Sequence, residues 1–272
     1  MSLLRIDASI GSRGPIGRFD VPHHCPHTER AVVNFATLRL EPGTTMNPSK
    51  HFGLVGGLGV GATVLYYQAI AEACARRNIA PRLTIANAHA PTALALVQAG
   101  RIEDLATYLA GFVRELAASG ATFFAIPAIT PHICLVELKR HVSLPIVDIL
   151  EITVELLRNR RLSRVALFGT RFTIDRDLFG ALDSFDIVHP QEGEIDEIHR
   201  IYLQLATLGN ISADDEARLR DLGNTLCQRD GVEAVLLAGT DLNLTFNEAN
   251  AGFPAVDCAA AHIDAIVAQM SN

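Results

Sequence analysis

The feature that most constrains the fold of this chain is an alternation of apolar strand-like segments with helix-like segments that runs through the sequence twice. Alternation of this kind is typical of a parallel sheet with helices on both faces. The first run predicts strands at 51–55, 82–86 and 121–126, with helices at 63–77, 91–98, 102–119 and 131–141. The second run predicts strands at 164–168, 186–188, 232–237 and 254–257, with helices at 175–182, 194–208 and 213–230 and a final helix to the C-terminus.

The two runs predict a duplicated α/β architecture. We expect a first lobe over residues 51–160 and a similar second lobe over 161–272, each a parallel sheet flanked by helices. Ligands of open parallel sheets bind beyond the carboxyl ends of the strands, so the expected site is a cleft between the lobes. Residues 1–50 lack clear periodicity and are expected to form a poorly ordered extension, and Met46 is an alternative start of translation.

Composition narrows the class of protein. The 272 residues are 49% hydrophobic and 19% charged, which is enough apolar material for a substantial core. The net charge of -7 argues against a nucleic-acid partner, and no uninterrupted apolar run is long enough to predict a membrane span. Five cysteines without a C-x-x-C pair, together with the absence of an apolar block at the N-terminus, predict a cytoplasmic protein.

A cluster of potential metal ligands lies in the extension. It comprises His23, His24, Cys25 and His27 in a stretch rich in proline and charge. No periodic element flanks these residues to fix a ligand geometry, so the sequence favours a solvated tail and no metal is predicted.

A glycine-rich loop follows the first strand. Gly57, Gly59 and Ala62 match the pattern G-x-G-x-x-A, in which backbone amides at a helix N-terminus approach a pyrophosphate. A nicotinamide site also needs an acidic residue at the end of the second strand, and Asn87 stands there instead. Gly57 and Asn87 are therefore candidates for a small-anion site, with a purely structural turn as the alternative.

A second candidate turn joins the third strand to a helix. Thr130 is suited to cap this helix and Pro131 to its first position, so the free amides there would attract a carboxylate. His132 is either a general acid or base or a histidine bonded within the structure. Cys134 is either a thiolate stabilised by the helix or a small core residue.

The second lobe supplies two more candidates. Asp241 follows the strand at 232–237 and either caps the next segment or transfers a proton. Arg171 follows the strand at 164–168, where a guanidinium is suited to bind a carboxylate, unless it is simply solvated.

From residue 51 onward the sequence resembles the aspartate/glutamate racemase family. The resemblance rests on the loop at 56–63, the turn at 127–132, and the segments 169–174, 201–202, 240–242 and 254–262. It implies a two-lobed fold, a likeness to cofactor-independent amino-acid racemases, a small acidic amino acid or related carboxylate as ligand, and a homodimer. It further implies that Thr130, Thr240 and Arg171 contact substrate.

The sequence departs from that family at both catalytic thiols. The positions that match the family's two cysteines are Ala128 and Gly239. Removal and return of an α-proton need a positioned base and acid, which alanine and glycine do not provide. The leading hypothesis is therefore proton transfer at the α-carbon by His132 or Asp241, with Cys134 as a further candidate. The alternatives are a carboxylate-binding protein without catalysis and, less favoured, a nicotinamide-dependent enzyme.

Overall fold

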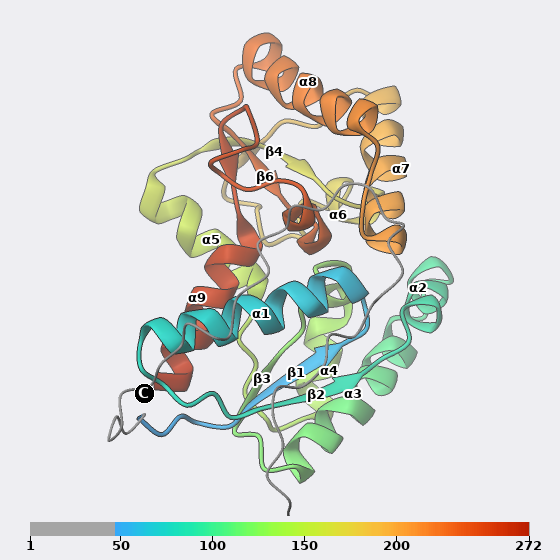
Figure 1. Ribbon diagram of the computed structural model, residues 1–272. Coiled ribbons are helices and arrows are strands. Elements are labelled where there is room, and N and C mark those ends of the chain that lie inside the picture. The colour runs from blue at the N-terminus through green and yellow to red at the C-terminus, as the bar shows by residue number, and fades with distance from the viewer. Residues whose placement is uncertain (1–46, 272) are drawn as a thin grey trace, which may run out of the picture. The chain divides into compact units, whose positions relative to one another are not determined.

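The structure of the protein is a computed structural model that describes residues 47–271 (Figure 1). The histidine-rich cluster at 23–27 and Met46 lie outside the described residues, as do residues 1–46 of the poorly ordered extension expected over 1–50. The described chain forms two parallel sheets, as the repeated strand–helix pattern predicts.

The first sheet has the strand order β2-β1-β3. Buried β1 (Phe52–Gly56) is its central strand and pairs in parallel with β2 (Leu83–Asn87) and β3 (Phe123–Ala125). The helices of this lobe are α1 (Val60–Arg76), α2 (Ala90–Gln98), α3 (Ile102–Ala118) and α4 (Leu135–His141), and the 3-10 turn η2 (Thr130–Cys134) precedes α4.

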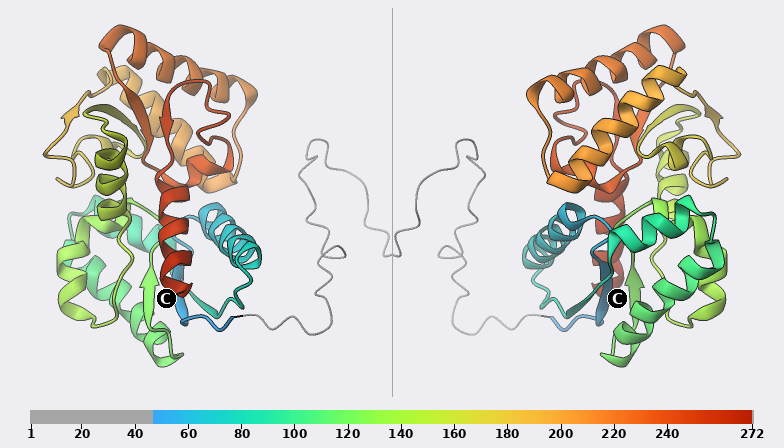
Figure 2. Two further views of the ribbon diagram at one scale, coloured as in Figure 1. Left: turned by 90° about the vertical axis from the view of Figure 1, so that its left-hand side faces the viewer. Right: turned by 90° about the vertical axis from the view of Figure 1, so that its right-hand side faces the viewer.

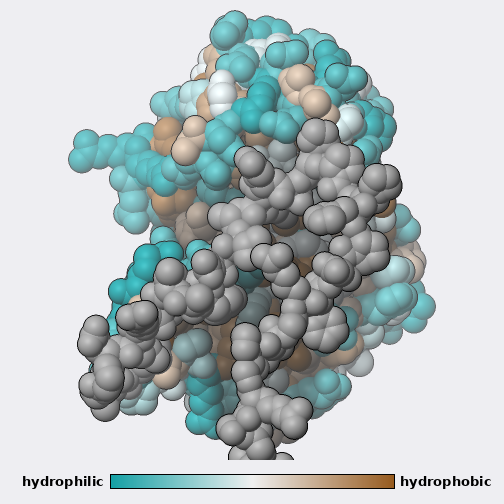
Figure 3. Space-filling view, viewed as in Figure 1, coloured by the Kyte–Doolittle hydropathy of each residue, from teal (hydrophilic) through white to brown (hydrophobic). Residues whose placement is uncertain are grey.

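The second sheet has the strand order β5-β4-β6-β7, again all parallel. Its strands are β4 (Arg164–Phe168), β5 (Asp186–Ile187), β6 (Ala234–Leu237) and β7 (Ala255–Val256). The short helix α6 (Arg171–Ile174), the long helices α7 (Glu192–Leu208) and α8 (Ala213–Asp230), and the 3-10 turn η3 (Thr240–Leu244) complete this part of the chain. Hydrophilic side chains cover the surface around α8 (Figure 3).

One helix from each half of the chain packs into the core of the other lobe. Helix α5 (Ile149–Arg160) precedes β4 and packs its buried face into the core of the second sheet. Helix α9 (Cys258–Ser271) leaves the second sheet, runs beside α1 and packs into the core of the first (Figures 1 and 2). The chain therefore crosses between the lobes twice.

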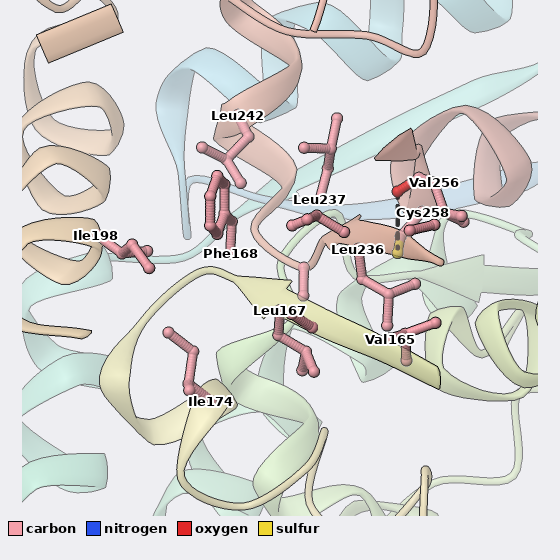
Figure 4. Close-up of a cluster of buried hydrophobic side chains, with 14 of the residues drawn as sticks. Val165, Leu167, Phe168, Ile174, Ile198, Leu236, Leu237, Leu242, Val256 and Cys258 are labelled. Atoms are coloured by element: carbon pink, nitrogen blue, oxygen red, sulfur yellow. Dashed lines mark hydrogen bonds between the residues drawn. The ribbon is translucent and has the colours of Figure 1, made fainter. Parts of the chain in front are cut away.

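The core of the second lobe shows why its strands are almost entirely apolar. Both faces of β4 and β6 are covered, so Leu167, Phe168 and Leu236 are each at most 1% exposed (Figure 4). Leu242 and Ile198 bring η3 and α7 into the same cluster. Burial of this core holds the turn that carries Asp241 in place.

The helix expected at 175–182 is wrong. The regular helix ends at Ile174, and Asp177, Leu178 and Phe179 adopt left-handed backbone conformations in the turn that follows. Leu178 and Leu182 are nevertheless fully buried, so their apolar spacing reflects a packed turn.

Two other elements differ from the sequence prediction. The segment expected as one helix at 131–141 begins as the 3-10 turn η2 before α4 starts at Leu135. Helix α5 was not predicted, although Asp148 caps it by accepting a hydrogen bond from the Leu150 amide at 2.9 Å. Its early residues Ile149, Ile152 and Thr153 are β-branched, which weakens a helix pattern in the sequence.

Among the described residues, no helix is both long and apolar enough to cross a membrane.

Candidate active site

A pocket of about 350 Å³ opens between the two lobes, beyond the carboxyl ends of their strands. We call it the interlobe pocket. The first lobe contributes the loop after β1, helix α2 and the turn after β3, and the second contributes α7 and η3. Its position is the one that the duplicated parallel sheets predict.

Among the described residues that line the pocket, Asp241 is the only one whose side chain can carry a charge near neutral pH. Its Oδ1 accepts a hydrogen bond from the Ala62 amide at 3.0 Å, and its Oδ2 accepts one from the Tyr202 hydroxyl at 3.3 Å. Within residues 47–271 it forms no ion pair with a lysine or arginine. Burial of the carboxyl raises its pKa to about 6, although both hydrogen bonds favour the carboxylate. The group can therefore gain and lose a proton near neutral pH.

The glycine loop leaves room for Asp241. A Cβ atom on Gly59 would lie 2.6 Å from the Asp241 Oδ2, and one on Gly61 would lie 2.5 Å from Leu244. The Asp241 carboxylate thus lies against the first turn of α1, where a pyrophosphate would lie in a dinucleotide site. These contacts give the G-x-G pattern a structural cause and leave the nicotinamide alternative without support.

Gly57 maintains the turn itself. Its φ of 81° is in the left-handed region, and a Cβ atom would lie 2.1 Å from the carbonyl oxygen of Ala88. Its amide donates to Thr63 Oγ1 at 2.9 Å, and the exposed Asn87 side chain donates to Ala88 O at 3.2 Å. Neither Gly57 nor Asn87 lines the interlobe pocket.

Replacing Gly57 with alanine is expected to lower the free energy of unfolding by about 2–4 kcal/mol, because strain at φ and a backbone clash add. The matched control is Gly100→Ala, at a φ of 67° with nothing within 4 Å of its added Cβ. It should lose only about 1 kcal/mol. Urea unfolding of both variants measures the difference, and equal losses would show that the contact with Ala88 is unimportant.

The two positions that are expected from the sequence to correspond to the family's thiols have different surroundings. Ala128 is 7% exposed and lines the pocket. Gly239 is covered by Tyr202, because a Cβ atom there would lie 2.2 Å from the Tyr202 ring. Ala128 is therefore open to a ligand in the pocket, and the space beside Gly239 is occupied by an aromatic ring.

Both candidate threonines form hydrogen bonds within the protein. Thr240 is fully buried, and its hydroxyl donates to the carbonyl oxygen of Pro127 at 2.9 Å across the lobes. Thr130 lines the pocket and shares a hydrogen bond with Thr170 at 3.2 Å. Of this pair, Thr130 is the one placed to contact a ligand.

His132 and Cys134 lie behind the wall of the pocket. His132 is 3% exposed and its Nδ1 lies 2.8 Å from the carbonyl oxygen of Ala128, while its Nε2 has no hydrogen-bond partner. Burial lowers the pKa of His132, which keeps the ring neutral. Cys134 donates to Pro131 O at 3.2 Å, and burial raises the pKa of its thiol to about 12. Neither residue lines the pocket.

Arg171 is held by acidic residues of its own lobe. Its guanidinium contacts Glu192 at 2.9 Å and Asp196 at 2.6 Å, with Asp175 at 3.8 Å. It does not line the pocket. The structure thus brings Asp241, Thr130 and Ala128 together and places His132, Cys134, Arg171, Gly57 and Asn87 outside that group.

Tyr202 is a pocket side chain for which the sequence predicts no role. It lies on the inner face of α7, lines the pocket, contacts Asp241 and covers Gly239. Burial and the neighbouring Asp241 raise the pKa of its hydroxyl well above the usual value, so it stays protonated as a donor. In the sequence Tyr202 counts among the residues on which the family resemblance rests, but its place in a buried helical stripe does not indicate a contact with Asp241.

Metal ligands do not cluster in the part of the chain that the structure describes. No three histidine, cysteine or acidic side chains there are arranged to hold an ion. Four cysteines lie in this part, none of them paired, and none lines the interlobe pocket.

The fold and the pocket define a two-lobed α/β protein with a ligand site between its sheets. The family model for Asp/Glu/Hydantoin racemases matches residues 55–266, and the chain belongs to this family.

Three solved structures show the same fold. A candidate Asp/Glu racemase from Yersinia pestis superposes with a TM-score of 0.71 at 20% identity, over 82% of this chain and 100% of that one. An aspartate racemase homologue from Pyrococcus horikoshii gives a TM-score of 0.67 at 24% identity, over 82% and 100%. The aspartate racemase of Picrophilus torridus gives 0.66 at 20% identity, over 81% and 94%.

The raised pKa of Asp241 has a consequence for stability. Between about pH 4 and pH 6 the folded state binds more protons at this carboxyl than the unfolded state does, so its contribution to stability falls as pH rises. A shift from 3.8 to about 6 corresponds to about 3 kcal/mol. Chemical denaturation at several pH values should show that the stability of the natural protein relative to Asp241→Asn falls between about pH 4 and pH 6. A stability difference between the two proteins that does not change with pH would contradict the raised pKa.

Proposed function

We propose that this protein catalyses a cofactor-independent proton transfer at the α-carbon of a small acidic amino acid or related carboxylate bound in the interlobe pocket. In this proposal Asp241 is the acid and base. The observation that carries the proposal is the position of Asp241 in the pocket with a pKa near 6. A group with such a pKa can act as base and as acid at neutral pH.

The proposed step is a reversible transfer. The Asp241 carboxylate removes the α-proton, and the electrons of the C–H bond delocalise into the substrate's carboxyl group. The protonated Asp241 then returns a proton to the same carbon. The Tyr202 hydroxyl, 3.3 Å from Oδ2, stabilises the carboxylate form, and the Ala62 amide fixes its orientation.

In the proposed reaction the proton is removed and returned on the same face of the α-carbon. Ala128 offers no acid or base where the family has one thiol, and the Tyr202 ring covers the place of the other at Gly239. Inversion by two groups needs an acid on the face opposite the base. We therefore expect exchange of the α-proton with solvent to be faster than inversion of configuration.

The experiment that tests this function is proton NMR of candidate acids incubated with the protein in D₂O. The set includes both enantiomers of aspartate and glutamate, and phenylacetate. Loss of an α-proton signal that depends on the protein supports the proposal. Absence of exchange for every acid, in samples that remain folded, contradicts the proposed proton transfer.

A carboxylate-binding protein without turnover is the second candidate. It is favoured by the absence of both thiols and by the hydrogen bonds that already satisfy Asp241. A rise in melting temperature with an acid that undergoes no exchange would support this candidate.

We further propose a cytoplasmic homodimer, as the family resemblance implies. Val60, Val64 and Tyr67 are 67%, 50% and 52% exposed and lie on one face of α1, which supports an association surface. Light scattering after gel filtration should give twice the mass of one chain, and Tyr67→Glu should shift it toward the single-chain mass. A single-chain mass for the unaltered protein at micromolar concentration would contradict the dimer.

A further inference from the structure

The walls of the interlobe pocket are apolar on the side formed by the first lobe. Pro91, Leu94 and Val97 come from α2, and Leu58 and Val60 come from the loop that leads into α1 and from its first turn. Leu203 adds an aliphatic side chain from α7. The polar groups, in contrast, come from η2, α7 and η3, where Thr130, Tyr202 and Asp241 lie. The pocket therefore has an apolar part and a polar part.

Positive charge is absent from the lining. Among the described residues that form the pocket there is no lysine, arginine or histidine. Arg171, the cation at the position implied to bind substrate, is engaged by Glu192 and Asp196 outside it. Asp241 has the same sign as a substrate carboxylate. One carboxylate can lie with the hydroxyl of Thr130, whereas a second one would have to lie against the apolar wall without a hydrogen-bond donor or a counter-ion, which is strongly unfavourable.

Building on the proposed function, we propose that the ligand is a monocarboxylic acid with an apolar aromatic or branched aliphatic group on its α-carbon, in place of an acidic side chain. The apolar group packs against α2, the carboxylate lies toward Thr130, and the α-carbon faces Asp241. A volume of about 350 Å³ fits this size, since an apolar cavity of about 150 Å³ already binds benzene. An aromatic group also delocalises charge that develops on the α-carbon, which aids removal of the proton.

The test is calorimetric titration of the full chain with phenylacetate and 4-methylpentanoate, compared with succinate and L- and D-aspartate. The two apolar acids are expected to bind at least tenfold more tightly than the dicarboxylates. Tighter binding of succinate or aspartate than of both apolar acids would overturn the proposal.

A matched pair of variants locates the apolar group. Leu94→Arg places a cation on the pocket wall, and Ala95→Arg places the same side chain on the exposed face of the same helix. Phenylacetate binding should be lost in the first and kept in the second. Leu94→Ala, which preserves a neutral wall, should weaken phenylacetate binding on the order of tenfold. Equal affinity in all three variants would overturn the assignment of α2 as the recognition wall.

The failures of the two proposals are distinguishable. Tight binding of phenylacetate without α-proton exchange leaves the ligand class supported and contradicts the proton transfer. Exchange of aspartate, with no binding of either apolar acid, supports the proton transfer and overturns the ligand class.

Discussion

Replacing Asp241 with asparagine is expected to slow α-proton exchange by about 10²–10⁴-fold. Asparagine has the same shape, and its carbonyl oxygen can still accept from the Ala62 amide, but it cannot take up a proton at neutral pH. The loss should appear in the exchange rate at saturating acid, with ligand binding largely retained. Comparison of exchange rates by proton NMR in D₂O measures the effect.

The control for this variant is Asp257→Asn. Asp257 is also buried and its pKa is also raised by burial, but it accepts from the Ala260 amide at 2.7 Å and lies outside the interlobe pocket. Its variant should keep the exchange rate within about threefold, since the amide still caps α9. A similar loss in both variants would indicate a general structural effect and contradict the role of Asp241.

Replacing Gly239 with alanine is expected to destabilise the protein by about 2–4 kcal/mol. The backbone at Gly239 is extended, with φ of -148°, so the conformation itself suits any residue. The cost comes from the added Cβ, which would meet the Tyr202 ring at 2.2 Å. Urea unfolding monitored by circular dichroism measures the loss.

Two further variants show whether the ring is the cause. Tyr202→Ala alone leaves a cavity, and combined with Gly239→Ala it should cost less than the sum of the single losses, because the clash has been removed. Gly193→Ala, in the first turn of α7 with open space around its Cβ, should be neutral or slightly stabilising. Additive losses at Gly239 and Tyr202 would contradict the contact.

Most of the fold can be predicted from the sequence because both sheets are parallel and buried. Strands such as β1 and β6 are continuous apolar runs, and the long helices α3 and α7 have clear amphipathic spacing. The sequence wrongly predicts a helix at 175–182 because Leu178 and Leu182 have helical spacing, although they are buried in a turn whose backbone is not helical. The exchange of α5 and α9 between lobes depends on packing between distant segments, which a local pattern does not contain.

The candidate site was only partly predictable. The sequence places Thr130 and Asp241 in turns that follow strands, and the structure confirms both turns. Ligands of parallel sheets bind at such turns. Sequence position could not distinguish these two residues from His132 and Arg171, because side-chain direction and neighbouring charge decide which groups line the pocket. The glycines of the first loop predict space for an anion, and the carboxylate of Asp241 lies in this space and accepts from the Ala62 amide, 179 residues away in sequence.

The most direct test of the account is the stereochemical course of exchange for the chiral acid that reacts fastest in D₂O. Each enantiomer is incubated separately, and deuterium incorporation by NMR is compared with inversion by chiral chromatography. The account predicts that deuterium enters with retained configuration well before inversion accumulates, and that Asp241→Asn abolishes this incorporation. Inversion as fast as exchange, or undiminished exchange in Asp241→Asn, would contradict a one-sided transfer by Asp241.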